Sequence, residues 1–84
     1  MKDVFYLKEE VITIDLHKFR VWEAMQYLNN TILVASPKIK EIVVIHGYHN
    51  GNVLLNMVRN EYRNPRVKSK YISLNPGITS LILK

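Results

Sequence analysis

Two apolar runs rich in β-branched residues, each followed by a helix-like segment, constrain the fold of this chain most strongly. The runs lie at residues 11–14 and 41–45, and short apolar runs of this composition are typical of buried strands. Each run ends in a turn that contains histidine, and each turn leads into a segment with helical periodicity. Strand–helix–strand connections are right-handed, so both helices should cover one face of the sheet. The first two strands should be parallel neighbours.

The spacing of apolar residues predicts two helices. The first is expected over residues 21–35, because Pro37 disfavours helical backbone just before it. Its buried face should consist of Val21, Met25, Leu28, Ile32 and Ala35. The second is expected over residues 52–63, with Asn50 as its N-cap and Pro65 beyond its end. Its buried side should carry Leu54, Met57, Val58 and either Tyr62 or Glu61.

The rest of the chain predicts a β-hairpin. Residues 67–74 read as a third strand, residues 75–77 (Asn-Pro-Gly) as a turn, and residues 78–83 as a fourth strand. The predicted order is β-α-β-α-β-β. Residues 11–84 should therefore form one α/β domain, a two-layer sandwich with a four-stranded mixed sheet and two helices on one face. Residues 1–10 are expected to be an N-terminal arm or an edge strand.

Composition narrows the class of protein. The 84 residues contain no cysteine, which excludes disulfides and thiolate metal sites. The sequence shows neither a membrane-spanning stretch nor a signal-peptide pattern, so we expect a cytoplasmic protein with no membrane partner.

The chain carries a net charge of +5, and its basic residues are densest between residues 59 and 70. Arg59 and Arg63 should share a helix face, and Arg66, Lys68 and Lys70 should alternate onto one side of a strand. A basic surface of this kind favours a polyanion, most often nucleic acid. The alternative is a solvated face that only keeps a small domain soluble.

The two histidine-containing turns are the candidate functional site, because parallel neighbouring strands bring such turns to one edge of the sheet. Asp15, His17 and His46 are the candidate catalytic residues, since a histidine can take or give a proton near pH 7 and Asp15 could orient either one or hold a cation. Structural capping is the alternative role for each.

The turn after the second strand is glycine-containing and precedes a helix start, which favours a bound phosphate. The candidate phosphate-binding residues at the two turns are Lys18, Arg20, Gly47, Tyr48, His49, Asn50 and Gly51. Tyr48 could also stack on an unpaired base. A turn that merely joins strand to helix is the alternative.

The chain also resembles the small MutS-related (Smr) domain family at these positions. Residues 14–17 (IDLH) resemble its leucine-aspartate-leucine-histidine-glycine motif, and residues 45–47 (IHG), with Gly51 four residues on, resemble its histidine-glycine-x-glycine motif. The likeness covers about residues 11–84. It departs at Lys18, which replaces a glycine, at Arg20, which replaces the threonine N-cap, and at Tyr48 and His49.

The resemblance implies a fold like the C-terminal domain of translation initiation factor three. It also implies nucleic-acid binding and, in several members, nicking of DNA or cleavage of RNA. Carried over to this sequence, the preserved motif positions are Asp15, His17, His46 and Gly47.

Three functions stay open at the level of sequence: an endonuclease acting on phosphodiester bonds, a non-catalytic nucleic-acid or ribosome-associated interaction module, and a small phosphate-ligand protein. A divalent cation near Asp15 is expected for cleavage of DNA. Two free histidines acting as base and acid would suffice for RNA. The sequence indicates no particular protein partner.

Overall fold

The computed structural model describes residues 10–48 and 51–84 and has the predicted order of elements. The strands are β1 (Val11–Asp15), β2 (Glu41–Ile45), β3 (Val67–Ile72) and β4 (Ile78–Leu83). The helices are α2 (Val21–Val34), α3 (Val53–Asn56) and a π-helix, η1 (Met57–Glu61). The predicted N-cap Asn50 and nearly all of the predicted arm at residues 1–10 lie outside the described residues. The N-cap of α3 is Asn52.

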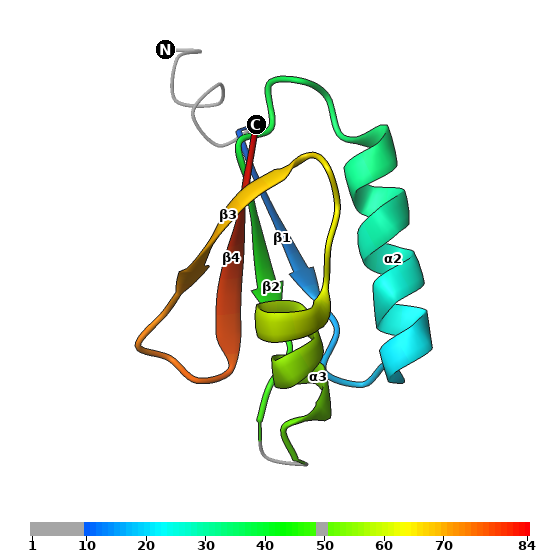
Figure 1. Cartoon of the computed structure of the whole chain (residues 1–84), viewed down its shortest axis with the longest axis vertical. Coiled ribbons are helices and arrows are strands. Elements are labelled where there is room, and N and C mark those ends of the chain that lie inside the picture. The colour runs from blue at the N-terminus through cyan, green and yellow to red at the C-terminus, as the bar shows by residue number, and fades with distance from the viewer. Residues whose placement is uncertain (1–9, 49–50) are drawn as a thin grey trace, which may run out of the picture.

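The four strands form one mixed sheet in the order β1-β2-β4-β3. β1 and β2 are parallel neighbours, and β3 and β4 form an antiparallel hairpin, as the sequence predicts. β4 lies between β2 and β3, so the connection through α3 and η1 passes over it. Because both crossovers run in the same direction along the sheet, right-handed connections place α2 and α3 on the same face, as Figure 1 shows. The opposite side is called the open face below.

The core lies between the sheet and the helices. Along β2, Ile42 and Val44 are fully buried under the helices, whereas Val43 and Ile45 alternate onto the open face and are only half-buried. The buried residues of α2 are Ala24, Leu28 and Ile32. Met25, which was predicted to be buried, is exposed, because the buried stripe is centred one position away on the small side chain of Ala24.

The second helix differs most from its prediction. It has one turn of α-helix, α3, and then widens into η1, where the Tyr62 N–H donates to Met57 O at 2.7 Å, five residues back. This arrangement buries Met57, Val58 and Tyr62, so Tyr62 rather than Glu61 faces the core. The Tyr62 hydroxyl donates to Asn29 Oδ1 of α2 at 2.6 Å, a contact between helices that local periodicity does not contain.

No helix among the described residues is long and apolar enough to cross a membrane.

Candidate functional site

Asp15 and His17 form a hydrogen-bonded pair at the end of β1. Two residues apart on an extended chain, they lie on the same side, and both flank the buried Leu16. Asp15 Oδ1 accepts from the His17 backbone N–H at 3.0 Å and lies 2.5 Å from His17 Nδ1. A carboxylate can only accept, so Nδ1 carries the proton and Nε2 is left with its lone pair. The hydrogen bond from the imidazole holds the pKa of Asp15 below its usual range.

The side chains of this pair are accessible to solvent: 45% of the His17 side chain and 52% of the Asp15 side chain are exposed. An ionised carboxylate that orients an accessible imidazole is a general-base arrangement. The ammonium of Lys18 also lowers the Asp15 pKa, so a positive charge lies near the pair. We call Asp15 and His17 the dyad.

His46 has a different environment from His17. It is 2% exposed, and its Nδ1 lies 2.9 Å from Gly47 O while its Nε2 lies 2.8 Å from Thr79 Oγ1. Because a carbonyl only accepts, Nδ1 carries the proton, and Nε2 accepts from the Thr79 hydroxyl. Thr79 Oγ1 in turn accepts from Arg59 Nε at 2.7 Å. Burial, with a smaller effect of the Arg59 charge, lowers the pKa of His46.

Both ring nitrogens of His46 are therefore occupied, and the expected pair of free histidines is not present. Asp15 and His46 end adjacent parallel strands, as predicted, but they do not share one face. Asp15 is level with Ile45 on the open face, whereas His46 follows Val44 under the helices. We assign His46 to positioning the turn rather than to proton transfer.

The glycines of the second turn shape its backbone and hydrogen-bond within the protein. Gly47 has φ +72°, and a Cβ on it would lie 3.2 Å from His17 Cβ, so glycine lets the two turns approach each other. Its N–H donates to Gly77 O at 3.0 Å, and the Gly51 N–H donates to Tyr48 O at 3.3 Å. Neither amide is left for an anion, so the predicted phosphate cradle is not built by these two glycines. His49 and Asn50 lie outside the described residues.

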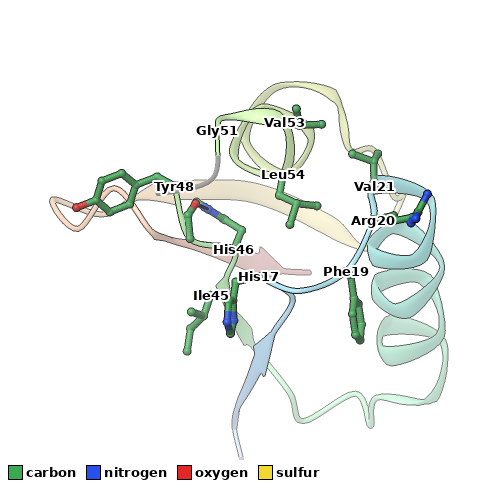
Figure 2. Close-up of a pocket in the computed structure, with 11 residues that line it drawn as sticks. His17, Phe19, Arg20, Val21, Ile45, His46, Tyr48, Gly51, Val53 and Leu54 are labelled. Carbon is green, nitrogen blue, oxygen red and sulfur yellow. Dashed lines mark hydrogen bonds between the residues drawn. The ribbon is translucent and has the colours of Figure 1, made fainter.

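A pocket of about 410 Å³ opens at this end of the sheet, between the first turn and the starts of α2 and α3 (Figure 2). Its apolar wall consists of Phe19, Val21, Ile45, Val53 and Leu54. The remaining lining residues are His17, Arg20, His46, Gly47, Tyr48 and Gly51. Tyr48 lines the edge, and its ring points away from Leu54 and Phe19 in Figure 2. The pocket brings residues of both predicted turns together.

Arg20 begins α2 as its N-cap although an arginine side chain has no acceptor for the helix N–H groups. The Glu23 carboxylate compensates by accepting from the Arg20 backbone N–H at 2.9 Å. The long guanidinium side chain of Arg20 is thus not used as a cap and lies exposed at the pocket.

The basic residues between 59 and 70 do not form the single surface that was predicted. Arg66 donates to the last carbonyls of α2 and the turn after it, including Ala35 O at 2.7 Å and Ser36 O at 2.6 Å. Lys70 Nζ donates to Tyr62 O at 2.8 Å, at the end of η1. A register shift in β3 between Val67 and Ser69 also interrupts the alternation that was expected to place these side chains together.

The other members of this group are also divided. Arg59 donates to Thr79 Oγ1 and to Ile78 O at 2.9 Å, and Arg63 donates to Tyr62 O at 3.2 Å. Lys68 is exposed at the register shift. The C-terminal end of a helix carries partial negative charge, so Arg66 and Lys70 cap the C-terminal ends of α2 and η1.

Comparison with known proteins identifies the family. The Smr domain model matches residues 14–77, which is more than half of the chain. The chain belongs to the Smr family. The crystal structure of the Smr domain of Thermus thermophilus MutS2 has a similar fold, with a TM-score of 0.76 at 22% sequence identity. That match covers 87% of this chain and 98% of the other. No curated protein sequence matches.

Within this Smr domain, sequence reasoning missed Thr79 and the apolar wall of the pocket. Thr79 is 33 residues from His46, and only the pairing of β2 with β4 brings the two together. An available signal was the threonine on the buried side of a predicted strand, because a buried hydroxyl needs a partner. Phe19 and Leu54 look like ordinary core residues in the sequence and carried no signal of their own.

Proposed function

We propose that this Smr domain binds nucleic acid at the edge of the sheet that holds the dyad, and that it cleaves the phosphodiester backbone of RNA there. The observation that carries the proposal is the dyad itself. The accessible imidazole of His17 lines a pocket. Its Nδ1 is held by the Asp15 carboxylate, and its Nε2 has no protein partner among the described residues. Two exposed cations lie at this end of the sheet: Lys18, whose charge acts on Asp15, and Arg20, which lines the same pocket at the start of α2.

The chemistry follows from this geometry. His17 Nε2 removes the proton of a ribose 2′-hydroxyl, whose oxygen attacks the adjacent phosphorus while the bond to the 5′-oxygen breaks. The products are a 2′,3′-cyclic phosphate and a 5′-hydroxyl: water protonates the leaving 5′-oxygen, and the hydroxide so formed takes the proton back from His17 Nε2. General-base catalysis of this kind contributes about 10²–10⁴-fold. Asp15 keeps the imidazole in the required tautomer, and the exposed cations stabilise the extra negative charge on the phosphate.

RNA is the better substrate for this site than DNA, because RNA carries its own nucleophile. Hydrolysis of DNA would instead need an activated water as its nucleophile. The divalent cation that the sequence suggested for DNA cleavage is therefore not part of this proposal.

The test uses single-stranded RNA and DNA of one sequence, incubated with the protein and a chelator. We expect RNA to be cleaved, and we expect His17→Gln to lower the rate by about 10²–10⁴-fold while it leaves binding intact. RNA with a 2′-deoxynucleotide at the cleaved position should resist. Equal cleavage by His17→Gln, or DNA cut as fast as RNA, would contradict the mechanism.

A non-catalytic nucleic-acid-binding module is the second candidate. This candidate is favoured because both ring nitrogens of His46 are hydrogen-bonded within the protein. His17 is then the one imidazole left at the site, whereas acid–base cleavage works best with two. For this module we expect salt-dependent binding to RNA with no cleavage by the unaltered protein, in the same experiment.

A further inference from the structure

We propose that the pocket beside the dyad takes one unpaired nucleobase, so that this domain selects single-stranded over duplex nucleic acid. This inference rests on the proposed nucleic-acid function and adds the form of substrate. The volume of the pocket, about 410 Å³, is near the lower end of ordinary small-ligand sites. This is the scale of a single nucleotide and not of a duplex.

The walls of the pocket suit the flat face of a base. Phe19 lies between the dyad and α2, and its ring packs against Tyr27 with centroids 5.5 Å apart and planes inclined at 57°. This contact braces the ring as a wall. Leu54 reaches toward the same space from α3, and Val53 beside it is 65% exposed (Figure 2). An aromatic and aliphatic wall holds a base of any sequence by stacking and burial.

The charge around the pocket suits the phosphate attached to that base. None of the described residues that line the pocket carries a carboxylate. His17 and Arg20, which have basic side chains, are among them. The exposed Lys18 follows His17 in the chain. A base held against Phe19 and Leu54 would leave its phosphate near the first turn, which carries His17 and Lys18. Apolar walls and a basic rim together fit a nucleotide unit of a polyanion.

A paired base cannot use this pocket without leaving its helix. In a duplex the base faces are stacked, and extruding one base costs a few kcal/mol before any contact is made. An unpaired base in a single strand, a loop or a bulge has little of this cost. The pocket should therefore favour unpaired regions even though the basic rim attracts either form.

The test measures binding of His17→Gln protein, which cleaves only slowly under the proposal, to three ligands of matched length: a uridine oligonucleotide, an abasic ribose-phosphate chain, and an RNA duplex. We expect the uridine chain to bind at least about tenfold more tightly than the abasic chain or the duplex at one salt concentration. Val53→Ser, which removes two methyl groups from the exposed rim, should weaken uridine binding by about tenfold and leave abasic binding unchanged.

Val34→Ser is the matched control, because Val34 is 79% exposed at the far end of α2. It should change none of the three affinities. Equal binding of uridine and abasic chains, or a Val53→Ser variant that behaves like Val34→Ser, would overturn the base pocket while leaving nucleic-acid binding in place. Failure of all three ligands to bind in a salt-dependent way would instead overturn the proposed function and this inference with it.

Discussion

The two histidines of the motifs have different environments because their side chains point to opposite sides of the sheet. His17 is accessible and paired with Asp15, whereas His46 is buried between Gly47 O and Thr79 Oγ1. Thr79 receives the Arg59 guanidinium as well, so a chain of hydrogen bonds joins the pocket turn to β4. Both ring nitrogens of His46 are hydrogen-bonded, whereas among the described residues only Nδ1 of His17 is, and His17 lines the pocket.

The first prediction concerns pH and His46. Its pKa lies below the ordinary 6.5 because burial disfavours the charged ring. As pH falls below about 6.5, the unfolded chain therefore takes up a proton at this position before the folded chain does. Stability should be fully present above that pH and decline below it, until the folded ring is itself protonated. Asp15 acts at lower pH, because its lowered pKa makes stability fall only below about 3.8.

Urea unfolding of the parent and of His46→Gln at pH 7.5 and pH 5.0 checks this prediction. The variant should be less stable at pH 7.5, because glutamine cannot keep both contacts, but it should lose less stability between the two values. A variant with the same decline as the parent would show that another group titrates in this window.

At the scale of elements, the basic residues near the C-terminal end of η1 and at the start of β3 hold the helix ends. The guanidinium of Arg66 donates to four carbonyls around the end of α2: Ile32, Ala35, Ser36 and Ile39. Helix α2 has no basic residue in its own last turn, so this guanidinium supplies the positive charge that its C-terminus favours. Loss of Arg66 should leave several carbonyls without a protein donor.

The second prediction compares Arg66→Met with Lys68→Met. Arg66→Met should lower the free energy of unfolding by about 2–3 kcal/mol, because hydrogen bonds to a charged donor are lost. Lys68 is exposed two residues away, and its replacement should change stability by less than about 0.5 kcal/mol. Chemical denaturation of both variants measures the difference. Equal small losses would mean that water replaces the guanidinium at no cost.

At the scale of the whole molecule, the two ends of the sheet carry different groups. The carboxyl ends of β1 and β2 carry the dyad, the pocket and the exposed cations Lys18 and Arg20. The opposite end carries the loop between α2 and β2, with exposed Lys38 and Lys40. Under the proposed function, net charge attracts a polyanion to either end, but the first end also offers the accessible imidazole of His17. Binding should therefore depend on position as well as on charge.

The third prediction uses salt dependence to locate the interface. Each phosphate contact contributes about −0.7 to the slope of log affinity against log salt for a single strand. The double change Lys18→Gln with Arg20→Gln should make that slope shallower by about 1.4. The matched change Lys38→Gln with Lys40→Gln removes the same charge at the other end and should leave the slope nearly unchanged. Equal effects of the two pairs would place the bound strand elsewhere.

Local spacing in the sequence predicted the strands and the first helix, and it placed Asp15 and His17 on one side of the chain; that Asp15 pairs with His17 rather than His46 came from the structure. Asp15 and His17 meet because an extended chain repeats every two residues, and this needs no distant partner. The strand–helix–strand order likewise predicted that β1 and β2 are parallel, and the right-handed rule predicted that both helices cover one face. These features depend on covalent geometry and short-range packing, which a linear pattern records directly.

Only the tertiary structure decided what the other polar residues do. Insertion of β4 beside β2 brings Thr79 to His46, and packing of β3 past α2 brings Arg66 to the helix end. Buried donors and acceptors pair with the groups that the topology places within reach. In this chain Thr79 is 20 residues from its partner Arg59 and 33 residues from its partner His46. The face to which a histidine points, and the carbonyl that a lysine or arginine meets, therefore follow from the assembled sheet and not from spacing along the chain.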